Sequence, residues 1–243
     1  MRRHAQDAAM HVGSSAIKFM SIGTLGEKSL HAALKEWVAQ PGDQFEVTVD
    51  GFVIDVARGE LLLEIQTRHL YAMKHKLSCL LPKHAVQILH PIAQEKWIVR
   101  ETAVGDPISR RKSPKRGQPG DVFRELVRLT DWLLHPNLVI TLLLTQEEEI
   151  WRDDGQGSWR RKHWSLYDRR LLGVVSQIIR TEKADFLALL PANLPDPFTN
   201  RQLADTLPCR PALAQKITYT LRHIQALSVA GKEGRSHLYT TRF

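Results

Sequence analysis

The sequence FVIDVARGELLLEIQ, residues 52–66, decides the fold. Its two runs of apolar and β-branched residues flank the turn-forming pair Arg58-Gly59, at the spacing of a β-hairpin. A further strand-like segment, residues 45–49, precedes the hairpin across an Asp50-Gly51 turn. The pattern therefore predicts three consecutive strands joined by tight turns.

The hairpin carries the candidate catalytic side chains. Residues two apart on a strand face the same side, so Glu64 and Gln66 are expected to point together. Asp55, on the preceding strand, can lie across the turn from Glu64. Two carboxylates in apolar strands are costly to bury unless they bind something, and a hard cation such as Mg²⁺ is their natural partner. Glu27, on a predicted helix before the strands, could add a third carboxylate.

The elements around the hairpin are predicted to follow the order α-β-β-β-α-β-β. Apolar residues at helical spacing indicate a helix before the strands, and Pro41-Gly42-Asp43 ends it. A second helix and two further strands follow the hairpin. The expected ranges are 27–38 and 70–81 for the helices, and 85–89 and 96–99 for the last two strands.

This order of elements, with a helix glutamate, then Asp, a hairpin and Glu-x-(Lys or Gln), resembles the PD-(D/E)XK, or restriction-endonuclease-like, superfamily. The resemblance covers roughly residues 20–100 and implies an α/β core, a mixed sheet flanked by helices. It implies that Asp55 and Glu64 hold Mg²⁺, for which Mn²⁺ can substitute. Glu27 would support the site, and Gln66 would take the position of the usual lysine.

Gln66 is a departure from the family pattern. The family's lysine positions or deprotonates the attacking water, and a neutral amide cannot act as a base. General-base catalysis contributes about 10²–10⁴-fold, so its loss matters. Glutamine occurs at this position in some active restriction enzymes of the superfamily, and Lys74 or Lys76 on the following helix could also reach the site. The alternative without chemistry is a plain hairpin whose Asp55, Glu64 and Gln66 face solvent.

The middle of the chain is predicted to contain a mobile basic loop. Residues 109–120 are polar and rich in Pro and Gly. Three of the loop's basic residues are candidates for neutralising phosphates: Arg110, Arg111 and Lys112. A helix is then expected over residues 121–134, a strand over 138–151, a return strand through 164 and a helix over 166–180.

The last residues match a winged helix-turn-helix. Thr199 and Gln202 fit a capping box that starts a short helix, Pro211 suits the first turn of a longer one, and a β-hairpin follows. Residues 199–243 hold seven basic and two acidic residues. The candidate contacts to nucleic acid are Arg210, Lys216, Tyr219, Arg222, Lys232 and Arg235. Winged helices also serve as protein-docking modules, so a protein partner is the alternative.

Composition narrows the class of protein. The 243 residues carry a net charge of +8 and a pI near 9.7, which is typical of proteins that bind a polyanion. There is no run of about 18 apolar residues, so no membrane span is expected. Two distant cysteines fit a reducing cytoplasm, and no P-loop or dinucleotide fingerprint suggests ATP or NAD.

The sequence thus predicts three parts: a flexible tail over residues 1–20, a nuclease-like domain over 21–165, and a connecting helix with a winged helix over 166–243. The expected function is that of a cytoplasmic, Mg²⁺-dependent DNA endonuclease that the winged helix positions on DNA. The alternatives are an inactive DNA-binding regulator or assembly factor and an RNA-processing nuclease. Homodimerisation stays open.

Overall fold

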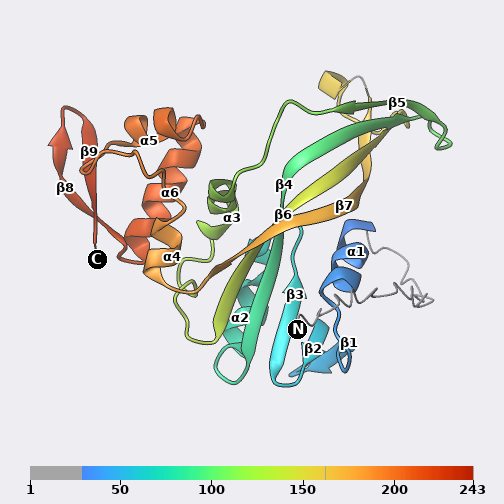
Figure 1. Ribbon diagram of the computed structural model, residues 1–243, viewed down its shortest axis with the longest axis horizontal. Coiled ribbons are helices and arrows are strands. Elements are labelled where there is room, and N and C mark those ends of the chain that lie inside the picture. Colours follow the sequence, from blue (N-terminus) through green and yellow to red (C-terminus); the bar gives the residue numbers. More distant parts are fainter. Residues whose placement is uncertain (1–28, 162, 243) are drawn as a thin grey trace, which may run out of the picture.

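A seven-stranded mixed sheet forms the centre of the computed structural model, which describes residues 29–161 and 163–242 (Figure 1). The strand order is β1-β2-β3-β4-β6-β7, and β5 pairs with the far part of β4. Strands β3, β4 and β6 are mutually parallel, and the other neighbours are antiparallel. The strands are β1 (Gln44–Val49), β2 (Phe52–Arg58), β3 (Leu61–Ile65), β4 (Ala85–Glu101), β5 (Pro107–Lys112), β6 (Leu138–Arg152) and β7 (Ser165–Arg180).

The elements between residues 29 and 101 follow the predicted order. Helix α1 (Ser29–Val38) buries Leu30 and Leu34, one turn apart, and the three hairpin-linked strands follow it. A 3₁₀ turn, η1 (Leu70–Met73), leads into α2 (Lys74–Leu80). The two strands expected after this helix are one continuous strand, β4, because β6 pairs with it along almost its full length.

The helix predicted over residues 166–180 is wrong, because this segment is the edge strand β7. It pairs antiparallel with β6 from Ile140–Arg180 to Arg152–Ser165, which satisfies its backbone groups. Its run of Val and Ile favours a strand, and Gly173 inside it costs a helix about 1 kcal/mol. The expected return strand through 164 is also wrong, since η3 (Trp159–Arg161) lies there.

The mobile loop predicted over residues 109–120 is wrong in its first part, which forms β5 against β4. Arg110 and Lys112 both lie over the ring of Trp97, at 5.1 and 5.2 Å from its centroid, so the strand's polar side chains find partners on β4. The helix expected over 121–134 is reduced to η2 (Pro119–Val122) and the one-turn α3 (Phe123–Leu126), followed by turns.

Two apolar clusters lie on the two faces of the sheet. One contains Leu30 and Leu34 of α1 together with Leu63, Ile65 and Leu143. The larger cluster contains Leu77 of α2 and Ile88 of β4 and continues without interruption to Phe186 and Leu221 near the chain's end. The sheet is therefore covered by α1 on one face and by α2 and the later helices on the other.

Residues 183–241 form the C-terminal group, in which a first helix is followed by the predicted short helix, longer helix and hairpin. Thr199 Oγ1 accepts a hydrogen bond from Gln202 N at 3.2 Å, and Thr199 N donates to Gln202 Oε1 at 2.7 Å, which confirms the capping box. In Figure 1 this group lies at one end of the molecule and β5 at the other. Its elements are α4 (Lys183–Leu187), α5 (Asn200–Thr206), α6 (Pro211–His223), β8 (Leu227–Glu233) and β9 (Ser236–Thr241).

No helix in the described ranges is long and apolar enough to cross a membrane.

Candidate active site

Asp55 and Glu64, the carboxylate pair, lie where β2 and β3 separate. The two strands pair only from the turn as far as Val56 and Leu63. One residue further on, the carboxylate of Asp55 accepts a hydrogen bond from Ile65 N at 2.7 Å. A side chain thus satisfies a backbone donor that the ladder leaves unpaired, and it fixes the carboxylate at the separation.

Glu64 is a buried carboxylate with a cationic partner. It is 5% exposed, and its Oε1 lies 2.5 Å from Nζ of Lys76 on α2. Lys76 also donates to the backbone carbonyl of Val53. Burial raises the pKa of Glu64, the hydrogen bond from Lys76 opposes this, and the negative charge of Asp55 raises the pKa further.

The pKa of Asp55 is shifted in the opposite direction. Burial alone would raise its pKa, but the hydrogen bonds from His31 and from Ile65 N hold the pKa below its ordinary value. Nε2 of His31, on α1, lies 3.2 Å from Asp55 Oδ2. The site therefore contains two neighbouring carboxylates whose surroundings separate their pKa values, an arrangement typical of acid–base and metal sites.

The two partners of the pair come from opposite faces of the sheet. His31 is on α1, which covers one face, and Lys76 is on α2, which covers the other. The separation of the strands lets both helices reach the pair. Lys76 was one of two lysines that the sequence offered in place of the family's motif lysine, whereas Lys74 is exposed.

Gln66 does not continue the alternation of β3, because the strand ends at Ile65. Its amide nitrogen donates to the carbonyls of Arg68 and His69, at 2.5 and 3.4 Å. The side chain therefore holds the turn after β3 instead of joining Glu64. Glu27, the remaining predicted member of the site, lies outside the described residues.

The donor set decides which metal could fit. In the ranges that the structure describes, no three or more His, Cys, Asp or Glu side chains are grouped to hold a metal. A zinc-type site with three or four protein ligands therefore has no support here. Mg²⁺ keeps several waters and needs only one or two carboxylates, so the oxygens of Asp55 and Glu64 suit it.

The predicted nucleic-acid contacts are split between the two ends of the molecule. On β5, Arg110 pairs with Glu148 at 2.7 Å and Lys112 with Glu95 at 2.8 Å, while Arg111 is exposed. In the C-terminal group, Lys216 is half-buried and its ammonium donates to the carbonyl of Arg124 at 3.3 Å, so it is less available to a ligand than the other candidates. The remaining candidates are exposed: Arg210, Tyr219, Arg222, Lys232 and Arg235.

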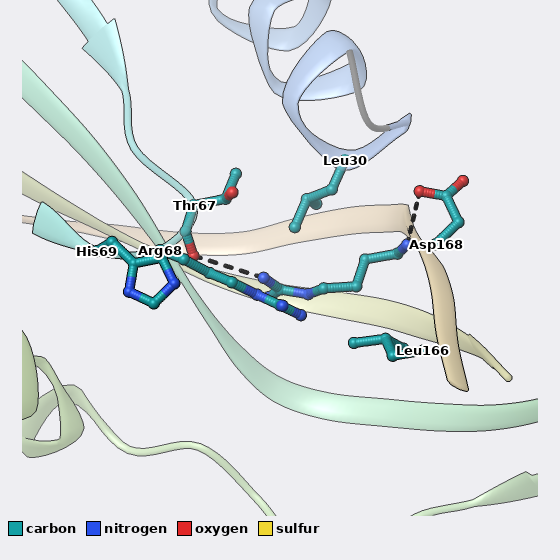
Figure 2. Close-up of a pocket in the computed structure, with 7 residues that line it drawn as sticks. Leu30, Thr67, Arg68, His69, Leu166 and Asp168 are labelled. Atoms are coloured by element: carbon teal, nitrogen blue, oxygen red, sulfur yellow. Dashed lines mark hydrogen bonds between the residues drawn. The ribbon is translucent and has the colours of Figure 1, made fainter. Parts of the chain in front are cut away.

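Sequence reasoning missed a pocket between α1, the turn after β3 and β7. The arginine pocket has a volume of about 230 Å³, and Figure 2 shows how its residues converge from three elements. The triplet Thr67-Arg68-His69, directly after the hairpin, was the available signal; its partners on β7 lay in a segment predicted as a helix. The pocket is lined by Leu30, Thr67, Arg68, His69, Leu166, Asp168 and Arg169.

Comparison with known proteins gives a family without a stated activity. Residues 28–181 match the family described as "Domain of unknown function (DUF8091)". An uncharacterized protein of Treponema pallidum (strain Nichols) is 33% identical over 227 residues, which cover 90% of this chain and 87% of the relative. No solved structure matches the chain.

Proposed function

The chain belongs to the DUF8091 family, and we propose that it is a metal-dependent nuclease with a restriction-endonuclease-like core, placed on DNA by a C-terminal winged helix. One observation carries the proposal. Asp55 and Glu64 lie within electrostatic reach of each other where two adjacent strands separate, and a half-buried lysine, Lys76, contacts Glu64. Charged groups of this kind are costly in a core, so their retention favours a chemical role.

The carboxylate pair would hold Mg²⁺. When bound, the metal would neutralise charge on a phosphate and lower the pKa of a water molecule. Asp55 stays ionised because His31 and Ile65 N hydrogen-bond it, and an ionised carboxylate is what a hard cation needs. Glu64 ionises less readily, because it is buried beside Asp55.

Lys76 would perform the task of the family's lysine in place of Gln66. Its ammonium is anchored between Glu64 Oε1 and the carbonyl of Val53, so it is positioned without help from solvent. There it would orient the attacking water and stabilise negative charge that develops on the phosphate. Gln66 would then act only on the turn that follows β3.

The C-terminal group would contribute binding rather than chemistry. Tyr219 and Arg222 share an exposed face of α6, and Lys232 and Arg235 lie on the β8–β9 hairpin near its turn. This arrangement would suit a recognition helix with a basic wing, in which phosphate contacts would set the register on the duplex. The net charge of +8 supports a polyanionic partner.

A DNA-binding regulator without catalysis is the second candidate. The observation that favours it is that both carboxylates already have partners within the chain, Glu64 through Lys76 and Asp55 through His31 and Ile65 N. A pair satisfied in this way can be purely structural. In that case, the basic surfaces would still bind DNA, but no metal would be taken up.

Cleavage assays separate the candidates. Labelled linear duplex, nicked duplex, single-stranded DNA and RNA are incubated with the full chain and Mg²⁺, then Mn²⁺. We expect cleavage of DNA that Asp55→Asn and Glu64→Gln each abolish, while the matched control Glu60→Gln, an exposed acid in the turn of the same hairpin, keeps full activity. DNA binding without cleavage under any condition favours the regulator, and cleavage of RNA alone favours the RNA-processing nuclease.

The role of Lys76 has its own test. Lys76→Met should abolish cleavage while leaving DNA binding intact, since the ammonium is half-buried and contacts Glu64. Adding Gln66→Lys to the Lys76→Met variant tests whether a lysine at the family's motif position restores cleavage. Unchanged cleavage by Lys76→Met would remove Lys76 from the mechanism.

A further inference from the structure

The arginine pocket collects two guanidinium groups from distant parts of the chain. Arg68 comes from the turn after β3, and Arg169 comes from β7. Figure 2 shows Arg68 and His69 on one side, Leu166 and Asp168 of β7 on the other, and Leu30 of α1 above them. The pocket shares two chain segments with the carboxylate pair: Leu30 precedes His31, which contacts Asp55, and Thr67 follows shortly after Ile65, whose N donates to Asp55.

Arg169 is held in place from one side only. Its Nε and Nη2 donate to Glu147 Oε2 at 2.9 and 2.7 Å, and its Nη1 makes one long contact to the Thr67 carbonyl at 3.5 Å. A guanidinium has five N–H donors, so donors remain for a ligand. The buried Glu147 thus fixes the orientation of Arg169 without using up its hydrogen-bonding capacity.

Arg68 is a cation whose guanidinium has no direct partner in the described part of the chain. Its guanidinium forms no hydrogen bond or ion pair with any residue that the structure describes, and the residue is exposed, so a ligand can reach it. Burial of part of the group and the positive charge of Arg169 lower its pKa, and the negative charges of Glu149 and Glu147 oppose this. Two guanidinium groups this close repel each other, and an anion between them would remove that repulsion.

The acidic side chains nearby are already engaged. The Asp168 carboxylate accepts hydrogen bonds from Ser29 N, Ser29 Oγ and Arg169 N. Glu149 is paired with Lys96 at 2.7 Å, and Glu147 with Arg169. Among the charged side chains named here, the Arg68 guanidinium is therefore the group without a hydrogen bond or ion pair in the described part of the chain.

The volume limits the size of the ligand. About 230 Å³ is several times the roughly 30 Å³ that a water molecule occupies. It is smaller than the about 300–1,000 Å³ of sites that enclose a whole drug-sized ligand. The pocket thus has room for a tetrahedral oxyanion with part of its attached group, and the leucine walls suit the carbon part of that group.

We propose that the arginine pocket binds a phosphate group of the nucleic-acid strand, adjacent to the phosphate that is cut, with Arg68 and Arg169 as donors. The choice of a nucleic-acid phosphate rests on the proposed function, whereas the anion site rests on the pocket alone. Gln66 is a positioning residue for this site, because its amide holds the carbonyls of Arg68 and His69.

The test compares Arg68→Gln with Arg170→Gln in the full chain. Arg170 is a matched control, since it is an exposed arginine on β7 that does not line the pocket. Calorimetric titration with inorganic phosphate at constant ionic strength should show about tenfold weaker binding for Arg68→Gln, as expected for loss of one charged hydrogen bond, and no change for Arg170→Gln. Equal phosphate affinities in the two variants would overturn the anion site.

Binding to duplex DNA without metal tests the assignment to substrate. Arg68→Gln should weaken DNA binding and lower the slope of log K against log salt by about one unit, because one fewer counterion is released. An unchanged DNA affinity, together with lost phosphate binding, would overturn the substrate assignment in favour of a free phosphate. If Arg68→Gln loses binding of both phosphate and DNA, and the natural chain cleaves no substrate, the anion site is supported and the nuclease proposal is rejected.

The positioning role of Gln66 is tested with inorganic phosphate as well. Gln66→Glu presents only acceptors to the two carbonyls and should weaken phosphate binding, whereas Gln66→Lys keeps a donor and should retain it. Equal phosphate affinities in these two variants would contradict a role for Gln66 in shaping the pocket.

Discussion

Glu64 and Arg222 are charged residues of two candidate functional regions, and they differ in burial. Glu64 is 5% exposed, touches Lys76 and lies within electrostatic reach of Asp55. Arg222, on α6, is exposed to solvent. A buried charge interacts strongly with a bound ligand, because the surrounding dielectric is low. An exposed charge is screened by salt and contributes mainly to attracting a partner. Chemistry is therefore expected at the carboxylate pair, and affinity from the C-terminal group.

The largest expected difference is in stability. Lys76→Met leaves Glu64 buried without its cation, which should lower the free energy of unfolding by about 3 kcal/mol, whereas Arg222→Met should change it by less than about 0.5 kcal/mol. Urea unfolding of both variants measures this. The double variant Lys76→Met/Glu64→Gln should recover part of the loss, because no charge is then left unpaired. Equal values for the two single variants would mean that the pair is not buried in solution.

The pH dependence of stability sharpens the contrast within the pair. The pKa of Glu64 is raised above 4.5. Its contribution to the free energy of unfolding is therefore fully present below pH 4.5 and is lost as the pH rises through the raised pKa. The pKa of Asp55 is lowered below 3.8, so its contribution is present above that value and is lost as the pH falls through the lowered pKa.

Urea unfolding across the acidic range, with Glu64→Gln and Asp55→Asn, tests these two signs. Glu64→Gln should be less stable than the natural chain at low pH, and this difference in the free energy of unfolding should shrink as the pH rises. For Asp55→Asn the difference should shrink as the pH falls. If the stability differences of both variants change in the same direction with pH, the two carboxylates do not occupy distinct environments.

A smaller effect is expected from the exposed charges of the C-terminal group. Arg222→Ala, Lys232→Ala and Arg235→Ala should each lower the slope of log K against log salt for duplex DNA by about one unit. None should change the unfolding midpoint. Lys216→Ala should change the slope least, because its ammonium donates to the Arg124 carbonyl. Unchanged slopes for all four would leave this group as a protein-docking module.

The smallest effect is expected on β5. Arg110 is half-exposed, pairs with Glu148 and lies over Trp97, so Arg110→Ala should cost less than about 1 kcal/mol of stability. Its DNA affinity should stay close to that of the natural chain, since the charge is already partnered. A loss of affinity as large as that of Arg222→Ala would move the DNA-binding surface to this end of the molecule.

The predictions from sequence succeeded where structure is local. The Arg58-Gly59 turn, the Thr199–Gln202 capping box and the Leu30–Leu34 spacing each depend on residues a few positions apart, and all three are present. They failed where pairing is distant. β7 becomes a strand because β6 supplies its hydrogen bonds, and the local signals in residues 166–180, the Val and Ile run with Gly173, favour a strand but do not by themselves decide against a helix.

The candidate site divides in the same way. Asp55 and Glu64 follow from the hairpin's register, and Lys76 was among the options that the sequence offered. The place of Gln66 was not predictable, because it depends on β3 ending one residue earlier. The arginine pocket was not predictable either, because Arg68 and Arg169 meet only through the fold of the whole sheet.

The most direct test of the central claim is Mn²⁺ binding to the full chain, followed by electron paramagnetic resonance of the free ion. We expect the natural chain and Glu60→Gln to take up Mn²⁺ with the same affinity, and Asp55→Asn and Glu64→Gln each to bind it at least about tenfold more weakly, as for loss of a charged ligand. Uptake of Mn²⁺ that is unchanged in both variants, or absent from the natural chain, would contradict a metal site at the carboxylate pair.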